Sequence, residues 1–265
     1  MNFSGQTVWI TGASSGIGEA LAGAVSKAGG AVILSGRREA ELQRVAAGLP
    51  GDSLILPFDA TDYDALPAIV AQAEGWRGQI DMLVNNAGIS QRSLGIETKF
   101  EVYRNLMEVD FFAPLRLTQL VLPAMIARRS GHLVATSSVA GKAGSPLRTG
   151  YCAAKHAVMG YFDALRAEIA KYDIKVTVLT PGFVRTAIAT HALTADGSAR
   201  GYSDDNIDAG ISPEEAAQQI MDGLAAGQRE IAVGKAGSPE MLLLDLKRQN
   251  PDGLFDIMAN MAKNL

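Results

Sequence analysis

Seven short apolar runs, separated by longer segments, constrain the fold of this chain more than any other feature of its sequence. Val, Ile, Leu and Thr dominate the runs, and polar residues barely alternate within them, which is typical of strands buried on both faces of a parallel sheet. Segments of helical character lie between most of the runs. This β–α order predicts an α/β fold in a single domain, with a doubly wound parallel seven-stranded sheet. The runs are TVWI (7–10), AVILS (31–35), LILPF (54–58), DMLVNN (81–86), HLVATS (132–137), KVTVLT (175–180) and EIAV (230–233).

The composition narrows the class of protein. The chain has 265 residues, 48% of them hydrophobic, which is enough for one large core. The 24 basic and 28 acidic residues give a net charge of −4, which argues against a nucleic-acid-binding protein, since such proteins usually carry a basic stripe. We find no signal-peptide pattern and no apolar stretch of about 18 residues or more, so we expect no membrane span.

The cysteine and histidine residues give two further expectations. The single Cys152 cannot form an internal disulfide and fits a reducing compartment, so we expect a soluble, cytoplasmic protein. We interpret it as a small, half-buried thiol on a helix rather than a nucleophile. His132, His156 and His191 stand apart without metal-ligand spacing, so no metal site is predicted.

The first strand-to-helix turn predicts a phosphate-binding site. TGASSGIG (11–18) follows the first apolar run and opens the first helical segment. Its glycines have the physical roles of a dinucleotide-binding turn: Gly12 permits the tight turn, Gly16 lets the backbone approach a pyrophosphate, and Gly18 lets helix and strand pack closely. The free N–H groups of the helix N-terminus favour an anion there.

The end of the second run indicates which dinucleotide binds. ILSGRR places Gly36 where an NAD-binding protein would carry an acidic residue for the ribose 2′-hydroxyl. Arg37 and Arg38 follow directly, and a guanidinium group suits a 2′-phosphate. We therefore expect NADP(H) as the cofactor.

Tyr151 and Lys155, in TGYCAAK (149–155), are four positions apart, so on a helix their Cβ atoms would lie on one face about 5–6 Å apart. Spacing alone does not distinguish a proton-transfer pair from a chance surface pair. An ammonium about 5 Å away, at an effective dielectric constant of about 20, would favour the phenolate by roughly 3 kcal/mol. That would lower the phenol pKa by about two units, into a range useful for acid–base catalysis.

Five motifs in order resemble the short-chain dehydrogenase/reductase (SDR) family, in its common subtype: TGASSGIG, NNAG (85–88), SSVAG (137–141), YCAAK (151–155) and PGFVRT (181–186). The likeness spans nearly the whole chain. HALTADGS (191–198) and the helical segment KHAVMGYFDALRAEI are further similar to the branch called dehydrogenase/reductase member 7B. We expect this chain to lack the membrane anchor of some members of that branch.

The resemblance implies a Rossmann-type domain and assigns roles to matching residues. Ser138 would hydrogen-bond the substrate oxygen, with its neighbour Ser137 the weaker candidate. Tyr151 would be the acid/base, and Lys155 would also bind the nicotinamide ribose. Asp59 would hold the adenine amino group and Thr186 the carboxamide. The full set of expected cofactor-binding residues is Gly12, Ser14, Ser15, Gly16, Ile17, Gly18, Arg37, Arg38, Asp59, Ala60, Asn86, Ala87, Gly88, Tyr151, Lys155, Pro181, Gly182, Val184 and Thr186.

Asp110 departs from the family pattern, in which an Asn at this point belongs to a water relay that returns protons to the Lys and Tyr. We count it with the catalytic set. An ionised Asp110 would weaken the pull of Lys155 on Tyr151 and raise the phenol pKa, whereas a protonated carboxyl, or one that caps nearby N–H groups, would mimic the amide. Pro114 could supply the helix kink that the Asn steadies in relatives.

Two segments outside the motifs have expected roles. Residues 187–211 combine scattered Gly, Asp, Ser and Asn with no strong periodicity, and they follow PGFVRT directly. We expect this segment to be a substrate lid that orders on binding. The C-terminal helical segment, 238–265, carries apolar groups that need a cover, so we expect it to help close the site or a dimer. The protein is expected to be a homodimer or homotetramer.

The expected function is transfer of hydride between NADP(H) and a small-molecule carbonyl or secondary alcohol, with Tyr151 as the acid/base. Two alternatives stay open. One is a reductase of carrier-bound β-ketoacyl groups, with Arg128 and Arg129 docking an acidic carrier protein instead of capping a helix. The other is a non-catalytic NADPH-binding sensor. The identity of the substrate is not encoded in any motif of the sequence.

Overall fold

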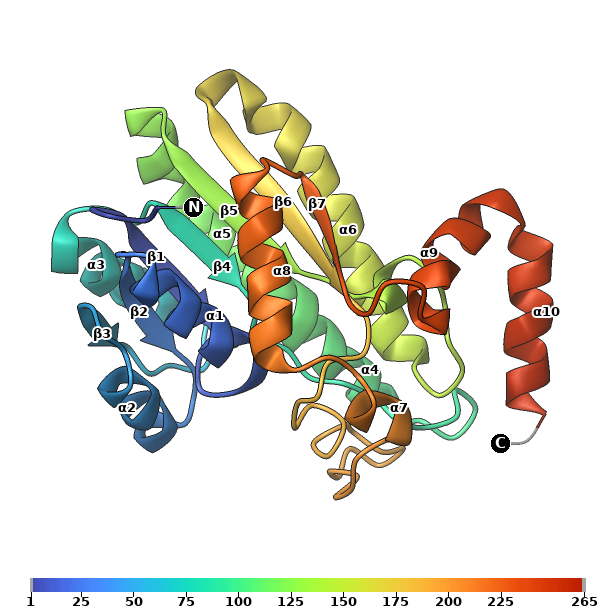
Figure 1. The fold of residues 1–265 in the computed structure, drawn as a ribbon. Helices are drawn as coiled ribbons and strands as arrows, with labels where there is room; N and C mark the ends of the chain where they lie inside the picture. The colour runs from blue at the N-terminus through green and yellow to red at the C-terminus, as the bar shows by residue number, and fades with distance from the viewer. Residues whose placement is uncertain (1, 264–265) are drawn as a thin grey trace.

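All seven predicted runs form strands of one sheet in the computed structural model, which describes residues 2–263 (Figure 1). Every strand pair is parallel, and the strand order is β3-β2-β1-β4-β5-β6-β7. The strands are β1 (Thr7–Thr11), β2 (Ala31–Ser35), β3 (Ser53–Ile55), β4 (Met82–Asn85), β5 (Gly131–Thr136), β6 (Ile174–Pro181) and β7 (Glu230–Val233).

The strand order reverses between β1 and β4, because β2 and β3 lie on one side of β1 and the later strands lie on the other. In such sheets the crevice outside the carboxyl ends of the strands at this switch point binds the ligand. Both the doubly wound fold and the single domain predicted from the sequence are confirmed.

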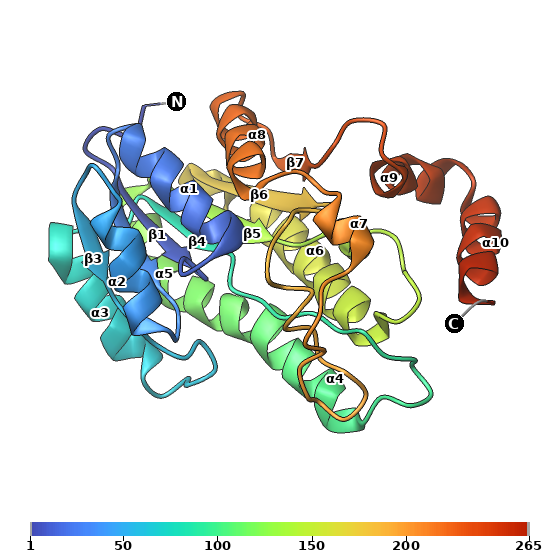
Figure 2. The ribbon, with the colours of Figure 1, turned by 60° about the horizontal axis from the view of Figure 1, so that its bottom comes forward.

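Two layers of helices cover the sheet (Figures 1 and 2). On one face α1, α2 and α8 pack over strand residues such as Val8 and Val32, and on the other α3, α5 and α6 pack over their neighbours Trp9 and Ile33. Successive strand residues therefore enter opposite cores, which explains why the runs are apolar without alternation. The helices that follow the motifs are α1 (Gly16–Lys27), α2 (Glu39–Ala47), α3 (Leu66–Arg77), α6 (Thr149–Ile169) and α8 (Pro213–Ala225).

Two local expectations are refined by the structure. The third strand is shorter than its apolar run because Pro57 has no N–H to donate, although Leu56 and Phe58 still donate backbone hydrogen bonds to Leu34 and Gly36 at 3.0 and 3.2 Å. The expected helical segment KHAVMGYFDALRAEI forms part of α6, and its apolar residues from Val158 to Ile169 lie in the core beneath the sheet.

One continuous helix runs from Phe100 to Arg128, through α4 (Phe100–Met107), the π-helical turn η1 (Glu108–Phe112) and α5 (Ala113–Arg128). By length and composition it is apolar enough to cross a membrane, with a mean hydropathy of 1.3 over its best window, which the sequence analysis did not anticipate. It also packs against α3, α6 and the sheet, and 33% of that window is buried. The expected absence of a membrane span stays a prediction.

The segment 187–211 contains a short helix, α7 (Asp205–Asp208), and otherwise turns and isolated bridges. Leu193 pairs with both Gln91 and Ala199, which holds this segment against the chain that follows β4.

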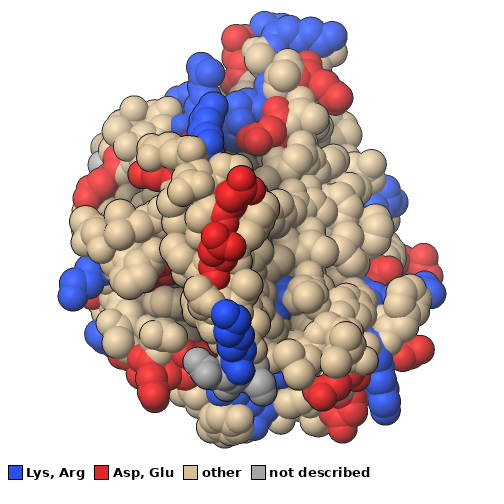
Figure 3. Space-filling model, turned by 90° about the vertical axis from the view of Figure 1, so that its right-hand side faces the viewer, with Lys and Arg blue, Asp and Glu red and all other residues tan. Residues whose placement is uncertain are grey.

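The C-terminal helices α9 (Pro239–Gln249) and α10 (Pro251–Ala262) stand at one side of the molecule, and α10 projects from the body (Figures 1 and 2). Four apolar side chains there are exposed, namely Leu242, Phe255, Ile257 and Met261. Seen from this side, most of the surface is uncharged, with a narrow acidic strip near its centre (Figure 3). The start of α9 packs behind Gly182, because a Cβ at that glycine would lie 2.9 Å from Glu240 Cγ.

Candidate active site

A cavity of about 640 Å³ opens at the carboxyl ends of the strands, within the size range of small-molecule sites. Of the sequence-predicted site residues, only Gly18 and Asp110 do not line it, since both lie behind its wall. No described residue of α9 or α10 lines it. The structure therefore brings residues from six separate motifs into one space.

The glycine turn after β1 is shaped to receive a phosphate. Gly12 and Gly16 have positive φ angles of 65° and 60°, which side-chain-bearing residues rarely adopt. A Cβ on Gly18 would lie 2.3 Å from the Gly12 carbonyl oxygen, so only glycine allows this close packing. No side chain caps the first turn of α1, which leaves its N–H groups free for an anion. These features fit a dinucleotide pyrophosphate.

The end of β2 carries the two arginines at the mouth of this turn. Arg38 Nη2 donates to the hydroxyl oxygens of Ser14 and Ser15, both at 3.1 Å. Gly36 leaves the position next to Ser14 without a carboxylate. Asp59, on the same side, accepts hydrogen bonds from Thr61 N and Oγ1 at 2.9 and 2.7 Å. The Thr61 backbone N–H, together with its hydroxyl and Arg37, holds the pKa of Asp59 below its usual value.

Asn86 joins three strand ends beneath the cavity. Its Nδ2 donates to the Thr11 carbonyl at 3.2 Å, and its Oδ1 accepts from Thr136 Oγ1 at 3.3 Å. The next residue, Ala87, lies so close to the glycine turn that a Cβ on Gly12 would be 2.8 Å from Ala87 Cα. Gly16 likewise lies against Thr186. The turn after β1 and the chain after β6 thus meet around one cavity floor.

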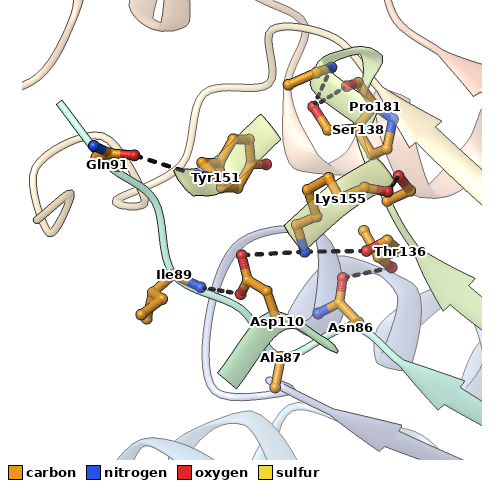
Figure 4. A network of polar contacts seen from close by, with 12 residues as sticks. Asn86, Ala87, Ile89, Gln91, Asp110, Thr136, Ser138, Tyr151, Lys155 and Pro181 are labelled. Carbon is orange, nitrogen blue, oxygen red and sulfur yellow. Dashed lines mark hydrogen bonds and ion pairs between the residues drawn. The ribbon is translucent and has the colours of Figure 1, made fainter. Parts of the chain in front are cut away.

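Tyr151 and Ser138 face each other at the inner end of the cavity (Figure 4). Ser138 Oγ accepts from Ala140 N at 3.1 Å and donates to the Pro181 carbonyl at 3.3 Å. Ser137 is buried and donates to the Lys155 carbonyl at 2.9 Å, so its hydroxyl is already engaged. Both serines line the cavity and both hydroxyl groups have protein partners, so the choice of Ser138 over Ser137 stays a prediction from the sequence.

The pKa of Tyr151 shifts opposite to the direction expected from the sequence. Burial raises it, and the carboxylate of Asp110 adds to that rise, while the Lys155 ammonium and Ser138 lower it. Lys155 Nζ lies 5.6 Å from the ring centroid, so the predicted attraction exists. The expectation of a net fall of about two units was wrong because it left out the cost of burying the phenolate.

Lys155 and Asp110 form a buried pair behind Tyr151 (Figure 4). Lys155 Nζ donates to the Thr136 carbonyl at 3.2 Å and lies 3.7 Å from Asp110 Oδ2. Asp110 Oδ1 accepts from Ile89 N at 2.8 Å, whereas Oδ2 has no hydrogen-bond partner. Burial raises the pKa of Asp110, against the opposing effects of Lys155 and Ile89 N–H.

Asp110 sits in the π-helical turn η1, a feature frequently found at functional sites. The wider turn and the missing N–H of Pro114, at the start of α5, occur together where the sequence predicted a kink. Asp110 thus caps a backbone N–H, as the amide of an asparagine could.

Several residues at the site carry no signal in the motifs. Gln91 Oε1 accepts from Gly150 N at 2.8 Å and from Tyr151 N at 3.3 Å, so it fixes the first turn of α6. Arg92 and Arg148 line the cavity near Tyr151. The only sequence signal for them was their position, just after NNAG and just before TGYCAAK.

The other sequence candidates have structural partners. Burial raises the pKa of the Cys152 thiol, which fits the interpretation of Cys152 as a structural thiol and not a nucleophile. His132 is hydrogen-bonded to Thr177, and burial lowers its pKa to about 4. No group of residues in the described chain has metal-site geometry.

Arg128 is the last residue of α5 and Arg129 follows it, at the amino ends of the strands and opposite the cavity. Arg128 donates to the Ile80 carbonyl, and Arg129 pairs with Asp173 at 2.7 Å. These contacts tie Arg128 to the chain before β4 and Arg129 to the chain before β6, and both the capping and the carrier-docking interpretations stay predictions.

Comparisons with known proteins agree on one family. A family model described as short chain dehydrogenase matches residues 6–196. Dehydrogenase/reductase SDR family member 7B of Xenopus laevis is 38% identical over 97% of this chain and 81% of its own length. The dehydrogenase/reductase SDR family protein 7-like of Anopheles gambiae is 40% identical over 100% of this chain and 85% of its own length. The resemblance to the 7B branch is thereby confirmed.

Solved structures give the same answer. A short-chain dehydrogenase from Streptomyces avermitilis superposes with a TM-score of 0.84, is 29% identical, and covers 99% of both chains. A short-chain dehydrogenase/reductase from Burkholderia phymatum, solved with NAD, has a TM-score of 0.81. At 21% identity over 95% of this chain and 96% of that one, the second likeness supports the fold alone.

Proposed function

This chain belongs to the short-chain dehydrogenase/reductase family, and from that premise we propose that it is an NADP(H)-dependent oxidoreductase acting on a carbonyl compound or a secondary alcohol. The observation that carries the proposal is the placement of Ser138, Tyr151 and Lys155 at one end of the cavity whose other end is the glycine turn. The Gly36–Arg37–Arg38 step beside that turn supports NADP(H) over NAD(H), because a guanidinium can pair with a 2′-phosphate.

The roles of the residues follow from their contacts. A bound nicotinamide supplies or accepts the hydride, and the protein handles the proton. Tyr151 protonates the substrate oxygen in reduction and takes the proton back in oxidation, while Ser138 donates a hydrogen bond to that oxygen. Lys155 opposes the rise in the Tyr151 pKa that burial causes, and its contact with the Thr136 carbonyl keeps the ammonium in place.

The test combines cofactor titration with one substitution. We expect NADPH to bind more tightly than NADH, and Tyr151→Phe to keep NADPH affinity while turnover of a responsive carbonyl falls by about 10²- to 10⁴-fold. Tyr161→Phe, on the same helix but packed among Phe111 and Phe162, is the matched control and should keep its activity. Tighter NADH binding would refute the cofactor assignment. Tight NADPH binding without turnover of any carbonyl or alcohol would instead support a sensor.

We also propose that residues 187–211 form the substrate lid. Ala187, Ala189 and Leu193 contribute to the cavity wall, and the segment begins directly after Thr186. Binding of NADPH should protect the segment from proteolysis, and an unchanged cleavage rate would count against a lid.

Assembly and localisation are further proposals. The exposed apolar groups of α9 and α10 support a homodimer or homotetramer in which these helices meet a second copy. Light scattering on the parent and on Phe255→Asp would test this, since a monomeric parent refutes it. The free Cys152 supports a cytoplasmic location, which fractionation of expressing cells would check.

A further inference from the structure

The inner end of the cavity, beyond Tyr151, carries more positive charge than hydride transfer requires. Arg92 and Arg148 both line it, although neither belongs to the glycine turn or to the Ser138–Tyr151–Lys155 set. Small and apolar groups such as Ala189, Leu193 and Ile207 line the same cavity. A guanidinium among such groups loses hydration, so an unpaired one is costly unless an anion joins it.

Arg92 already has a protein partner. Its Nη2 pairs with Asp204 Oδ2, and both side chains are largely buried, with 12% and 15% exposed. Asp204 Oδ2 also lies 3.7 Å from Arg200 Nη1, a buried atom that has no hydrogen-bond partner. One carboxylate therefore faces two guanidinium groups, and its charge is already shared between them.

Arg148 has no such partner for its inner nitrogen. Its Nε is buried and makes no hydrogen bond with any described residue. Arg92 and Arg200 face the single carboxylate of Asp204, so one of their two positive charges is unbalanced, and Arg148 adds another positive charge to the cavity wall, in a chain whose net charge is −4. The positive end of the cavity is thus a local feature and does not reflect the composition.

The residue directly before Arg148 has a strained backbone conformation. Leu147 has a φ of 64°, which a leucine rarely adopts, and its carbonyl accepts from Ser93 N at 3.0 Å. This hydrogen bond joins the segment of Arg148 to the segment of Arg92, so the two arginines flank one backbone contact. Strain of this kind persists where surrounding contacts enforce it, and it clusters at ligand-binding sites.

We propose that the substrate of this enzyme carries an oxyanion group, a carboxylate or a phosphate, that binds Arg148 with Arg92 beside it while the carbonyl faces Tyr151. This inference rests on the proposed function, because it names the substrate class of the same site. A guanidinium donates two parallel hydrogen bonds to either kind of oxyanion, which fixes the orientation of the substrate as well as its affinity. Arg148 is the principal contact and Arg92, already paired with Asp204, is the secondary one.

Matched substrates and matched variants test the proposal. The substrates are a neutral 2-alkanone, the keto acid of the same chain length, and the phosphate monoester of the corresponding hydroxyketone, each assayed by NADPH consumption. The variants are Arg148→Met, Arg148→Lys and, as control, Arg116→Met, which replaces an arginine of α5 that contacts Gln119 and does not line the cavity. Thermal melting of each variant confirms folding.

For the parent we expect a clear preference for one or both anionic substrates over the neutral ketone. In Arg148→Met the KM for the preferred anion should rise by about 10- to 100-fold, with kcat changed by less than about threefold. The KM of the neutral ketone should not change, Arg148→Lys should recover part of the loss, and Arg116→Met should match the parent. Whether the keto acid or the phosphate ester responds more strongly identifies the oxyanion.

A binding measurement separates this inference from the proposed function. Calorimetry with butanoate and with inorganic phosphate on the NADPH-loaded protein should show binding that Arg148→Met abolishes and Arg116→Met retains. If Arg148-dependent anion binding occurs but no carbonyl is reduced, the proposed function fails and the anion site stands. If neutral and anionic ketones are reduced equally well, or if Arg148→Met changes their KM equally, the anion site is refuted and the proposed function stands.

Discussion

Two turns at the cavity contain residues with a positive φ angle, and these residues are glycines in one turn and a leucine in the other. At the cofactor end, Gly12 and Gly16 adopt φ values of 65° and 60°. At the inner end, Leu147 adopts a φ of 64° just before Arg148. Glycine takes this conformation without a steric cost, whereas a residue with a Cβ pays roughly 1–2 kcal/mol. The cofactor end is therefore relaxed and the inner end strained.

This difference matches what each end has to do. The glycine turn must let a backbone approach a phosphate, a task shared by many dinucleotide-binding proteins. The loop at the inner end must hold particular side chains, Arg148 among them, in one arrangement. A strained residue is tolerated there because Ser93 N and the packing around Leu147 keep the loop in place.

The largest expected effect lies at the cofactor end. Gly18→Ala would place a Cβ 2.3 Å from the Gly12 carbonyl oxygen and 2.6 Å from Asn86 Nδ2. The phosphate turn must then shift, so we expect NADPH affinity to fall at least tenfold and the free energy of unfolding to drop by about 1–3 kcal/mol. Fluorescence titration and chemical denaturation measure the two effects.

The matched control for that change is Gly23→Ala on the same helix. A Cβ at Gly23 would meet nothing within 4 Å. Alanine is a better helix former than glycine by about 0.5–1 kcal/mol, so this variant should be more stable than the parent and bind NADPH equally well. Parent-like NADPH binding by Gly18→Ala would show that the turn is not built as tightly as the structure indicates.

The second effect concerns the choice of cofactor. Arg38→Met removes a guanidinium at the mouth of the glycine turn, together with its bonds to Ser14 and Ser15. The ratio of NADPH to NADH affinity should fall by about 10- to 100-fold, since a hydrogen bond to a charged group contributes about 1.5–3 kcal/mol.

Arg44→Met is the control for the cofactor prediction, because Arg44 is exposed on α2 and pairs with Glu19 and Glu41 on the surface. Surface pairs of this kind contribute about 1 kcal/mol or less, and this one lies outside the cavity. The affinity ratio should stay at the parent value. An unchanged ratio in Arg38→Met would leave Arg37 as the residue that reads the 2′-phosphate, or remove the preference for NADP(H) altogether.

The two ends of the cavity differ in how much of each could be predicted from the sequence. The strands were predictable because each is a local apolar run, and β2 and β7 begin and end where expected. The glycine turn was equally local. By contrast, Arg92 and Arg148 lie on segments far apart in the chain, and only folding brings them to one cavity, with Asp204 paired to Arg92 and Gln91 bonded to the start of α6. No periodic pattern in the sequence predicts that these residues come together in the fold.

The electrostatics of the site were foreseen only in part. The attraction between Lys155 and Tyr151 follows from a four-residue spacing, but burial of Tyr151 depends on the whole fold and outweighs it. The π-helical turn at Asp110 was likewise outside the reach of pattern analysis, because its residues look like those of an ordinary helix.

A smaller effect tests the strained end directly. Leu147→Gly and Leu147→Ala remove nearly the same side chain, but only glycine relieves the positive φ. The glycine variant should therefore be the more stable of the two by about 1 kcal/mol in denaturant unfolding. Leu49 is the control, since it is also half-buried outside a helix or strand and has no positive φ. There the alanine variant should be the more stable, by about 0.5–1 kcal/mol. The same order at both positions would mean that Leu147 is not strained.

The smallest expected effect concerns Asp110, whose buried carboxyl stands where the family pattern described above predicts an amide. Burial raises the pKa of Asp110, so at low pH the group is neutral and resembles Asn. Once the pH exceeds that raised pKa, the carboxylate charge raises the pKa of Tyr151, which delays formation of the phenolate that alcohol oxidation requires. Asp110→Asn removes this charge and retains an acceptor for Ile89 N. The rising limb of the pH–rate profile should therefore move to lower pH in the variant, by up to about one unit. Superimposed profiles would mean that Asp110 stays protonated throughout and that the carboxyl already acts as the amide does. An inactive parent rescued by the Asn variant would instead identify a chain whose catalytic set has degenerated, and would favour the NADPH-sensor function.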